Sequence, residues 1–541
     1  MKKKKKGFLL AFPAISGFLF FYLIPFLIVL WYSVSFGIGK REFVGLDNYK
    51  ELFKNTMFLL AVKNTCKYML VTIPVTLGTA LCISVILQQI TKGQKIFRLS
   101  FLYPIIMPIA SIVLVIQFFF KNNGFLNLIL NFFYLPEKDW LHTSSAFWII
   151  CILYFWKFVG YYIFIYSSRL QMIPKEYYEY ASLHGAGKWQ SFYYITCPIL
   201  FPVILFTLIL SIMNAFKCYR EAFLLGGTHP DNSIYFLQHF MNNNLQNLNY
   251  QKVSASATII TVFILFLSGL IYMIYYFQKR RLPMHKYKQY TRLFVFSIIA
   301  FIFLFPIIYL IVFSVFHSDT GFSLMNYYKV FLAKPDYLIK FWRSLAMCLM
   351  IAAGQTLFSC MSGTAFAKYS FPLKKYWFIL FALFMILPIQ VTLLPNYILL
   401  EKLKLLNSWK ALIIPAIFSP FGTVWLTFVF QAIPDSTLDA ARMDGVNQLQ
   451  MIRYIIVPNS KPAVITLFIL VFTESWNMVE QPILFLEKET DYPLSVFLAS
   501  LNQNAVGIQS VCGLLCLLPV TFFFLYYNTE LTDGLKDILW S

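Results

Sequence analysis

Long continuous apolar runs constrain this sequence more than any other feature. A helix needs about 20 apolar residues to cross the hydrocarbon core of a membrane, and runs of that length recur throughout the 541 residues. Hydrophobic residues make up 59% of the chain and charged residues only 12%, whereas soluble domains have about 45–50% and about 25%. Transmembrane β-strands would instead give short alternating segments. The sequence therefore predicts an all-α polytopic membrane protein.

About twelve membrane-spanning helices are predicted. Their approximate limits are 8–36, 65–88, 99–120, 145–168, 198–219, 255–277, 292–316, 342–366, 376–397, 411–431, 462–484 and 508–527. The first run is too long for a signal peptide and no small-x-small cleavage site follows it, so we expect an uncleaved span.

The charge distribution predicts which side of the membrane each loop faces. The net charge is +21, and Lys and Arg gather at Lys2–Lys6 and between Lys279 and Arg292. Cytoplasmic loops of membrane proteins collect these residues. We therefore expect the N- and C-termini in the cytoplasm, and the positive charge requires no nucleic acid partner.

A repeat with an offset of 260 residues relates the two parts of the chain. Residues 174–202 match residues 434–462 without a gap, and the identities include one glycine and three prolines. Each copy lies between the fourth and fifth spans of a set of six. The sequence thus predicts two tandem six-helix halves, 1–278 and 292–541, joined by a cytoplasmic basic linker at 279–291.

The second copy contains "STLDAARMDGVNQLQ", which predicts two short helices joined by a turn. Pro434 suits a helix start, and the spacing of Ser436 and Asp439 is that of a capping box for a helix over 437–443. Gly445 suits a left-handed residue at the helix end. Asn447 can cap a second short helix that runs to about residue 454.

The polar and small side chains of this copy suggest what it contacts. Ala440 and Ala441 predict a small face that another backbone can approach closely. The acidic Asp435, Asp439 and Asp444 can pair with basic groups elsewhere. A solvated connection between two spans is the plain alternative for either copy. Two copies at matched positions favour a docking surface that is used twice, for a partner with two equivalent sites.

The segment "DAARMDG", followed by "VP" and "KP", resembles the EAA loop of binding-protein-dependent ABC importer permeases, and "EYASLHG" resembles it more weakly. "FVGLDNYKELF" and "AVKNT" are similar to the N-terminal region of the maltose-type sugar permease. "FSLMNYYKVF", "LPNYILL", "SWKALIIPAIF" and "SWNMVEQPILFL" are similar to the second permease subunit of the same systems. The chain thus looks like a fusion of two normally separate MetI-like subunits.

This resemblance implies a permease that forms the pathway for a carbohydrate through a bacterial cytoplasmic membrane. In such importers an extracytoplasmic solute-binding lipoprotein delivers the sugar or oligosaccharide, and the EAA loops dock on two copies of a cytoplasmic ATP-binding subunit. Carried over position by position, the coupling residues are Glu179, Ala181, Gly185, Asp439, Ala441, Asp444 and Gly445.

Three residues depart from the family's loop pattern. His184 stands where Asp is usual, Tyr180 where Ala is usual, and Asp439 where Glu is usual. The first loop is therefore expected to dock more weakly than the second, or in a cleft of different shape.

The chain is not expected to be an enzyme or to hold a cofactor. In "GAGKWQ", Ser182 stands where the first P-loop glycine belongs and Trp189 where Ser or Thr is required. The nine cysteines form neither a CxxC pair nor a metal-ligand cluster. We therefore expect no metal and no cofactor, with ATP bound by partner subunits.

Polar side chains at membrane depth are costly and are candidates for the substrate pathway. The candidates are Lys157, Lys217, Arg220, Glu221, Glu474, Asn477 and Glu480. Related sugar permeases often have an acidic residue where Arg220 stands. For each candidate the alternative is an intramembrane ion pair or a side chain that reaches the interface.

Other transport classes remain as alternatives. An ion-coupled secondary transporter also has two six-span halves, but it would need an intramembrane proton or sodium site and no repeated docking loop. A channel would need neither. The sequence therefore favours the ABC permease.

Overall fold

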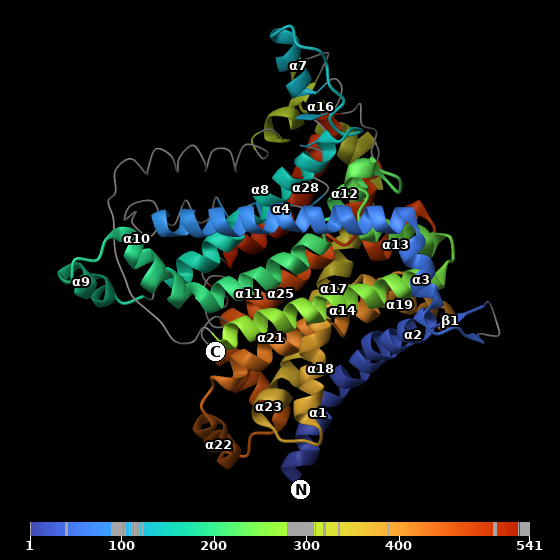
Figure 1. Cartoon of the computed structure of the whole chain (residues 1–541). Helices are drawn as coiled ribbons and strands as arrows, with labels where there is room; N and C mark the ends of the chain where they lie inside the picture. The colour runs from blue at the N-terminus through green and yellow to red at the C-terminus, as the bar shows by residue number, and fades with distance from the viewer. Residues whose placement is uncertain are drawn as a thin grey trace. The chain divides into compact units, whose positions relative to one another are not determined.

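The computed structural model describes residues 2–37, 42–87, 124–171, 173–277, 310–317, 321–333, 336–387, 389–500 and 506–527, with single positions between 101 and 120 and at 308 and 530. These residues are mainly helical (Figure 1). Their strands are two short antiparallel pairs, β1 (Ser35–Phe36) with β2 (Glu42–Phe43) and β3 (Phe316–His317) with β4 (Gly321–Phe322).

The long helices agree with the predicted spans. Eight of the described helices are long and apolar enough to cross a membrane, or up to ten if each of two bent pairs is one span. The predicted spans 99–120 and 292–316 lie largely outside the described residues. The eight to ten candidate membrane helices among the described residues confirm the all-α polytopic class.

The helices of the first half begin with α1 (Lys2–Phe18), a π-helical turn and α2 (Ile24–Ser33). The later ones are α3 (Asp47–Lys54), α4 (Thr56–Leu87), α7 (Phe125–Phe132), α8 (Ser145–Leu170), α9 (Lys175–Leu183), α10 (Lys188–Ser191), α11 (Cys197–Phe216), α12 (Tyr219–Gly226), α13 (Leu237–Gln246) and α14 (Tyr250–Phe277). Helix α4 starts nine residues before the predicted limit of the second span, at 56 instead of 65.

The helices of the second half include long helices and several short ones. They are α16 (Met325–Tyr328), α17 (Asp336–Lys368), α18 (Lys374–Ile386), α19 (Gln390–Lys402), α20 (Lys410–Ile417), α21 (Pro420–Gln431), α22 (Asp435–Met443), α23 (Gln448–Met451), α24 (Val457–Asn459), α25 (Lys461–Trp476), α26 (Glu480–Phe485), α27 (Leu494–Ser500) and α28 (Val506–Tyr526). Helix α17 also starts before the predicted limit of its span, at 336 instead of 342.

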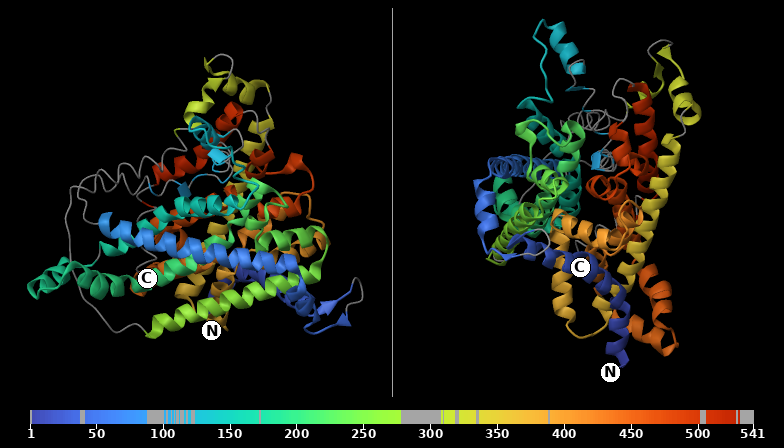
Figure 2. Two further views of the ribbon diagram at one scale, coloured as in Figure 1. Left: turned by 45° about the horizontal axis from the view of Figure 1, so that its top comes forward. Right: turned by 90° about the vertical axis from the view of Figure 1, so that its right-hand side faces the viewer.

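The chain divides into two compact units whose boundaries differ from those of the sequence halves. One unit holds residues 50–244 and 259–313, and the other holds 1–49, 245–258 and 314–541. Within the first unit, α4 and α8 pack along each other and both contact α11 (Figure 2). Within the second, α17 contacts α1, α21 and α25. The N-terminal helix thus packs with helices of the second sequence half.

Two glycines bring α1 close to its neighbours in that unit. A Cβ on Gly17 would lie 2.1 Å from the ring of Phe418, and one on Gly7 would lie 2.4 Å from the Cβ of Tyr369. Next to Gly17, Phe18 stacks on Phe381 with 4.2 Å between ring centroids. Larger residues at the two glycine positions would force α1 away from these contacts.

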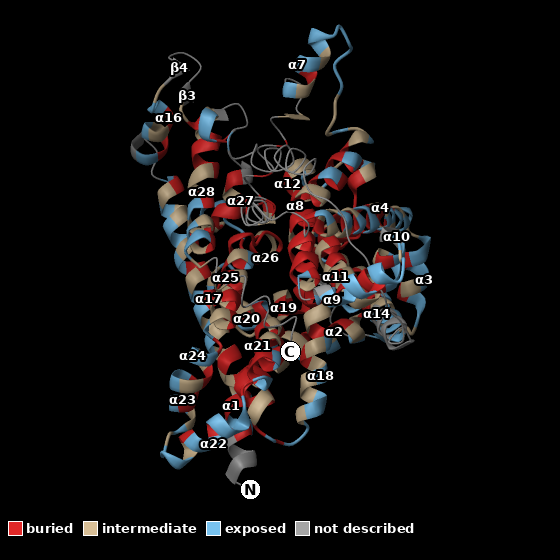
Figure 3. Ribbon diagram, turned by 90° about the vertical axis from the view of Figure 1, so that its left-hand side faces the viewer, coloured by how far each residue is buried: buried red, intermediate tan, exposed pale blue. Residues whose placement is uncertain are grey.

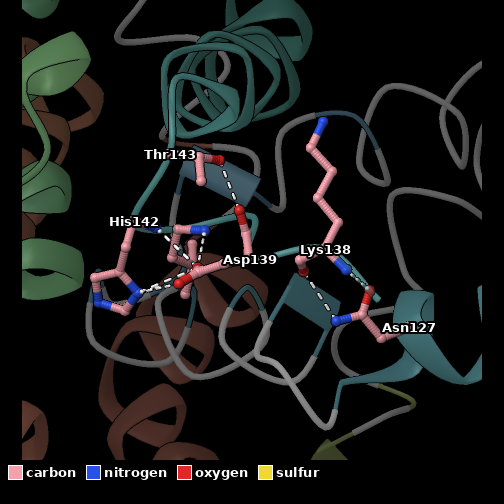
Figure 4. Close-up of polar contacts among 6 residues, drawn as sticks. Asn127, Lys138, Asp139, His142 and Thr143 are labelled. Carbon is pink, nitrogen blue, oxygen red and sulfur yellow. Dashed lines mark hydrogen bonds and ion pairs between the residues drawn. The ribbon is translucent and has the colours of Figure 1, made fainter. Parts of the chain in front are cut away.

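The loop between α7 and α8 is closed by its own hydrogen bonds (Figure 4). The Asn127 amide donates to the Lys138 carbonyl at 2.9 Å, and its oxygen accepts from the Lys138 backbone. Asp139 accepts from the backbone N–H and the ring of His142, and Thr143 donates to the Asp139 carbonyl at 2.6 Å. The backbone N–H of His142 lowers the pKa of Asp139, because it stabilises the ionised carboxylate.

Candidate functional site

The two repeated loops have the same secondary structure, element by element, at the offset of 260 residues. In the first, α9 and α10 lead into a π-helical turn at Phe192–Thr196 and then α11. In the second, α22 and α23 lead into a π-helical turn at Ile452–Ile456 and then α24. In Figure 1, α9 lies at the end of its unit beyond α10 and α11, and α22 lies beyond α23. The repeat is therefore one of structure as well as of sequence.

Both turns use a glycine in the left-handed region, as predicted for Gly445. The φ angles are +75° at Gly185 and +81° at Gly445. A Cβ at either position would meet no atom within 4 Å among the described residues. These glycines are therefore needed for backbone conformation and not for close packing within the chain.

The start of α22, the first short helix of the second loop, was predicted incorrectly. The capping box of Ser436 and Asp439 is wrong, because α22 begins at Asp435 and its N-cap is Pro434, which makes no side-chain cap bond. Ser436 already lies inside the helix and cannot cap it. Pro434 holds φ −60° and ψ 136°, so the chain leaves extended geometry directly after the proline.

The cap of the second short helix is confirmed. The Asn447 side chain accepts from the Gln450 backbone and the Gln450 side chain accepts from the Asn447 backbone, both at 2.9 Å. In the first loop only half of this box exists, because Gly187 donates to Gln190 at 2.6 Å but has no side chain to accept in return. The second turn is thus tied by one more hydrogen bond than the first.

Matched side chains fix each loop to its own unit. Tyr178 and Ala181 are buried in a cluster that includes Leu170 and Ile195, and the equivalent Leu438 and Ala441 are also buried. Most other positions of α22 are exposed (Figure 3). The predicted small face of Ala440 and Ala441 is therefore wrong. Consecutive helix positions point in different directions, so the motif alanine faces its own unit while Ala440 is exposed.

Lys368, the last residue of α17, anchors the second loop. Its side chain is only 6% exposed, and its Nζ lies 3.0 Å from the Asp435 carboxylate. The same ammonium donates to the carbonyls of Gln431 and Ile433, just before the loop begins. Asp439 pairs with Arg442 one turn along α22. The predicted pairing with basic groups elsewhere is thus confirmed for Asp435, whereas Asp439 pairs within its own helix.

Replacing Lys368 with Met is expected to loosen the second loop. The substitution removes charged hydrogen bonds to two carbonyls, each of which is worth about 1.5–3 kcal/mol, whereas the ion pair with the exposed Asp435 adds little. We expect faster amide hydrogen exchange over 432–446. Lys374→Met is the matched control, because Lys374 donates to the carbonyl of Tyr369 outside this loop. Equal exchange in both variants would disprove the anchoring role.

Two pathway candidates of the first half form a buried ion pair. The Nζ of Lys157 on α8 lies 2.5 Å from a carboxylate oxygen of Glu221 on α12, and the two side chains are 10% and 5% exposed. The other oxygen of Glu221 has no hydrogen-bond partner among the described residues. Arg220 is also buried. The structure therefore brings two candidates together as the ion pair that the sequence left as an alternative.

The remaining candidates lie near a helix end that occurs at the same position in both halves. Lys217 is the C-cap of α11, and Asn477, 260 residues later, is the C-cap of α25. The Asn477 amide donates to the Thr473 carbonyl at 3.0 Å. Glu480 is completely buried at the start of α26, whereas Glu474 is exposed. In both halves the helix after the repeated loop thus ends close to polar candidates.

A small, mostly apolar cavity beside α13 was missed by the sequence analysis. It has room for about one water molecule, and Tyr68 and Gln238 are among its lining residues. The Gln238 side-chain amide has no hydrogen-bond partner among the described residues. Next to Gln238, burial and the charge of His229 lower the pKa of His239 to about 3. The sequence signal for this cavity was the pair Gln238 and His239 within the aromatic segment "YFLQHF".

A family model described as "Binding-protein-dependent transport system inner membrane component" matches the chain twice, at residues 80–283 and 355–529. Each of the two segments contains one of the repeated loops. The family consists of transport components and not of enzymes, in agreement with the sequence analysis.

Two relatives that each match about half of this chain show the similarity. The probable ABC transporter permease protein YesP of Bacillus subtilis is 32% identical over 272 residues, which cover 48% of this chain and 88% of YesP. The trehalose/maltose transport system permease protein MalF of Thermococcus litoralis is 28% identical over 273 residues, and this alignment covers 49% of this chain and 92% of MalF. A crystal structure of a bacterial alginate ABC transporter covers 52% of this chain at 19% identity, with a TM-score of 0.45.

The two matched segments, the two structurally equivalent loops and the apolar helices give one consistent assignment. The chain is a multi-pass protein of the cytoplasmic membrane, and it belongs to the family of binding-protein-dependent transport system inner membrane components, with two copies of the family domain in one polypeptide.

Proposed function

We propose that this chain forms the whole translocation pathway of an ABC importer for a sugar or oligosaccharide. An extracytoplasmic solute-binding lipoprotein delivers the substrate, and two copies of a cytoplasmic ATP-binding subunit drive transport. The observation that carries the proposal is the loop that occurs twice with one helix–glycine–helix structure. The transport of trehalose and maltose named for the relative MalF supports a carbohydrate as the substrate.

The coupling residues fall on both faces of the loops. Ala181 and Ala441 attach the loops to the membrane helices, whereas Glu179, Asp439 and Asp444 are exposed. The buried face of each loop continues into the helix that follows it, α11 or α25. A displacement of the exposed face is therefore transmitted to the helices that carry the pathway candidates. In this proposal, closure of the ATP-binding subunits moves the two loops and thereby the helix breaks at Lys217 and Asn477.

Helix α8 fixes the relative sidedness of the first half. It runs from Ser145 to Leu170 and is long enough for one membrane crossing, with α7 before it and α9 after it. If α9 faces the cytoplasm, then α7 and the loop to residue 144 face outward, towards the solute-binding protein. Both termini are then cytoplasmic, as the distribution of Lys and Arg indicates.

Vesicle transport tests this function. Membrane vesicles that contain the chain, its ATP-binding subunit and its solute-binding protein should accumulate a labelled oligosaccharide only when ATP is supplied on the cytoplasmic side. Trehalose and maltose are the first substrates to try. Uptake driven by a proton or sodium gradient with no ATP-binding subunit present would contradict the proposal and identify a secondary transporter.

A further inference from the structure

The exposed faces of the two loops differ in side-chain size. On α9, the exposed positions Tyr177, Tyr180 and Leu183 are three residues apart and share one side of the helix. The matched positions on α22 are Thr437, Ala440 and Met443, also exposed. The first loop therefore presents two aromatic rings where the second presents a hydroxyl and a methyl group.

The two residues that depart most from the family pattern touch each other. The rings of Tyr180 and His184 lie 4.5 Å apart between centroids, and the His184 Nδ1 lies 2.8 Å from the Tyr180 carbonyl, so a proton on Nδ1 is donated to it. A side chain held in place before binding loses less entropy when a partner immobilises it. Tyr180, which is 67% exposed, is thus supported by His184 while its outer face stays open.

The second loop offers its partner less of this kind of surface. Its Asp435 and Asp439 already pair with Lys368 and Arg442, and Arg442 also lies over the ring of Tyr369. Charges that are neutralised within the chain add little further attraction for a partner. Met443 is the large apolar side chain that remains on this face of α22.

We propose that the first loop, which matches the family motif less well, is the stronger anchor for the ATP-binding subunit, with Tyr180 supported by His184 as its main contact. This inference rests on the proposed docking of both loops. The few residues that dominate binding energy at protein interfaces are enriched in Tyr, Trp and Arg. The cleft that receives α9 is then apolar and deep enough for a phenol ring. This ranking reverses the expectation from the motif.

A protein partner fits this face better than a lipid surface. Helix α9, KEYYEYASL, contains two glutamates and one lysine, whereas helices that bind the anionic inner leaflet are rich in Lys and Arg on their polar face. Glu176 and Glu179 are both exposed, beside the tyrosines. An anionic membrane surface would repel this helix. We therefore infer that its aromatic rings bind in a protein cleft.

Binding of the purified ATP-binding subunit to the full chain in lipid nanodiscs tests the ranking. Tyr180→Ala should raise Kd by about tenfold or more, as expected for an interface hot spot, and Met443→Ala by less than about threefold. Tyr180→Phe should recover most of the affinity. His184→Asp, which restores the usual family residue, should weaken binding about threefold, and it should have little further effect in the Tyr180→Ala background.

The outcomes separate this inference from the proposed function. A larger loss of affinity for Met443→Ala than for Tyr180→Ala would overturn the ranking but retain the docking role of the loops. Unchanged affinity in all variants would overturn both. Additive effects of Tyr180→Ala and His184→Asp would overturn the supporting role of His184. Because all three side chains are exposed, the variants should fold, which an unchanged Tm in the same nanodiscs would verify.

Discussion

Gly445→Asp is expected to leave the protein inserted in the membrane and to lower oligosaccharide uptake by about tenfold or more. Gly445 has φ +81°, a region that Asp and Asn adopt more readily than other residues with a Cβ. No described atom lies within 4 Å of the position of a Cβ. The new carboxylate would therefore project from the chain next to Asp444, into the surface proposed to meet the ATP-binding subunit.

Transport and ATP hydrolysis should respond differently to this change. In vesicles that contain the ATP-binding subunit and the solute-binding protein, uptake should fall more than ATP hydrolysis, because the loop transmits motion but performs no chemistry. Gly445→Asn is the matched control. Asn tolerates the left-handed region and has the size of Asp without its charge, so it should keep most of the uptake. Full uptake by Gly445→Asp would refute the coupling role of this turn.

The equivalent change in the first loop, Gly185→Asp, should have a milder effect. Gly185 has nearly the same conformation, at φ +75°. Its loop also carries Tyr180 and Leu183 one turn away, and we have proposed that this apolar face holds the partner without help from the turn. Comparable losses of uptake from both glycine substitutions would show that the turns, and not the helix faces, decide coupling.

Features that depend on local chemistry were predictable from the sequence. The glycine of the turn and the cap formed by Asn447 follow from backbone geometry and from a side chain that reaches its own neighbours. The starting residue of α22 did not follow, because Ser436 and Pro434 both suit a helix start and only one can be the cap. The small face of Ala440 and Ala441 failed for a separate reason, because consecutive positions of a helix point in different directions wherever the helix starts.

The early start of α4 has a different cause. Polar residues such as Asn64 and Thr65 made the first part of this span look unlike a membrane helix. In the structure Asn64 donates to the carbonyls of Asn232 and Tyr235, and Thr65 accepts from the backbone of Leu237. These polar groups form hydrogen bonds with a segment about 170 residues away in the sequence. No local sequence pattern reveals a partner at that distance.

The pairing of Lys157 with Glu221 was also beyond prediction, for the same reason. Seven polar residues at membrane depth were equal candidates, and the two that pair are separated by 64 positions. Which of them meet depends on how α8 packs beside α11 and on the break that directs α12 back towards it. Hydropathy locates the spans, but it does not give their rotation about their own axes.

Lys157→Met is expected to be the most destabilising single substitution among the pathway candidates. It would leave the buried Glu221 carboxylate without its cation, and breaking a buried ion pair by removing one partner costs about 3–5 kcal/mol. We expect a marked fall in the Tm of the detergent-purified protein, with lower yield from the membrane. Lys217→Met, at a half-buried position of the neighbouring helix end, is the control and should have a smaller effect.

The double variant Lys157→Met with Glu221→Gln separates stability from transport. Replacing both charges removes the uncompensated carboxylate, so most of the Tm lost in Lys157→Met should return. If uptake returns together with Tm, the pair serves only the fold and does not line the pathway. If Tm returns while uptake stays low, the charges act on the substrate or on the movement of α12 against α8. A double variant no more stable than Lys157→Met would show that the two residues are not energetically coupled, contrary to the geometry of the pair.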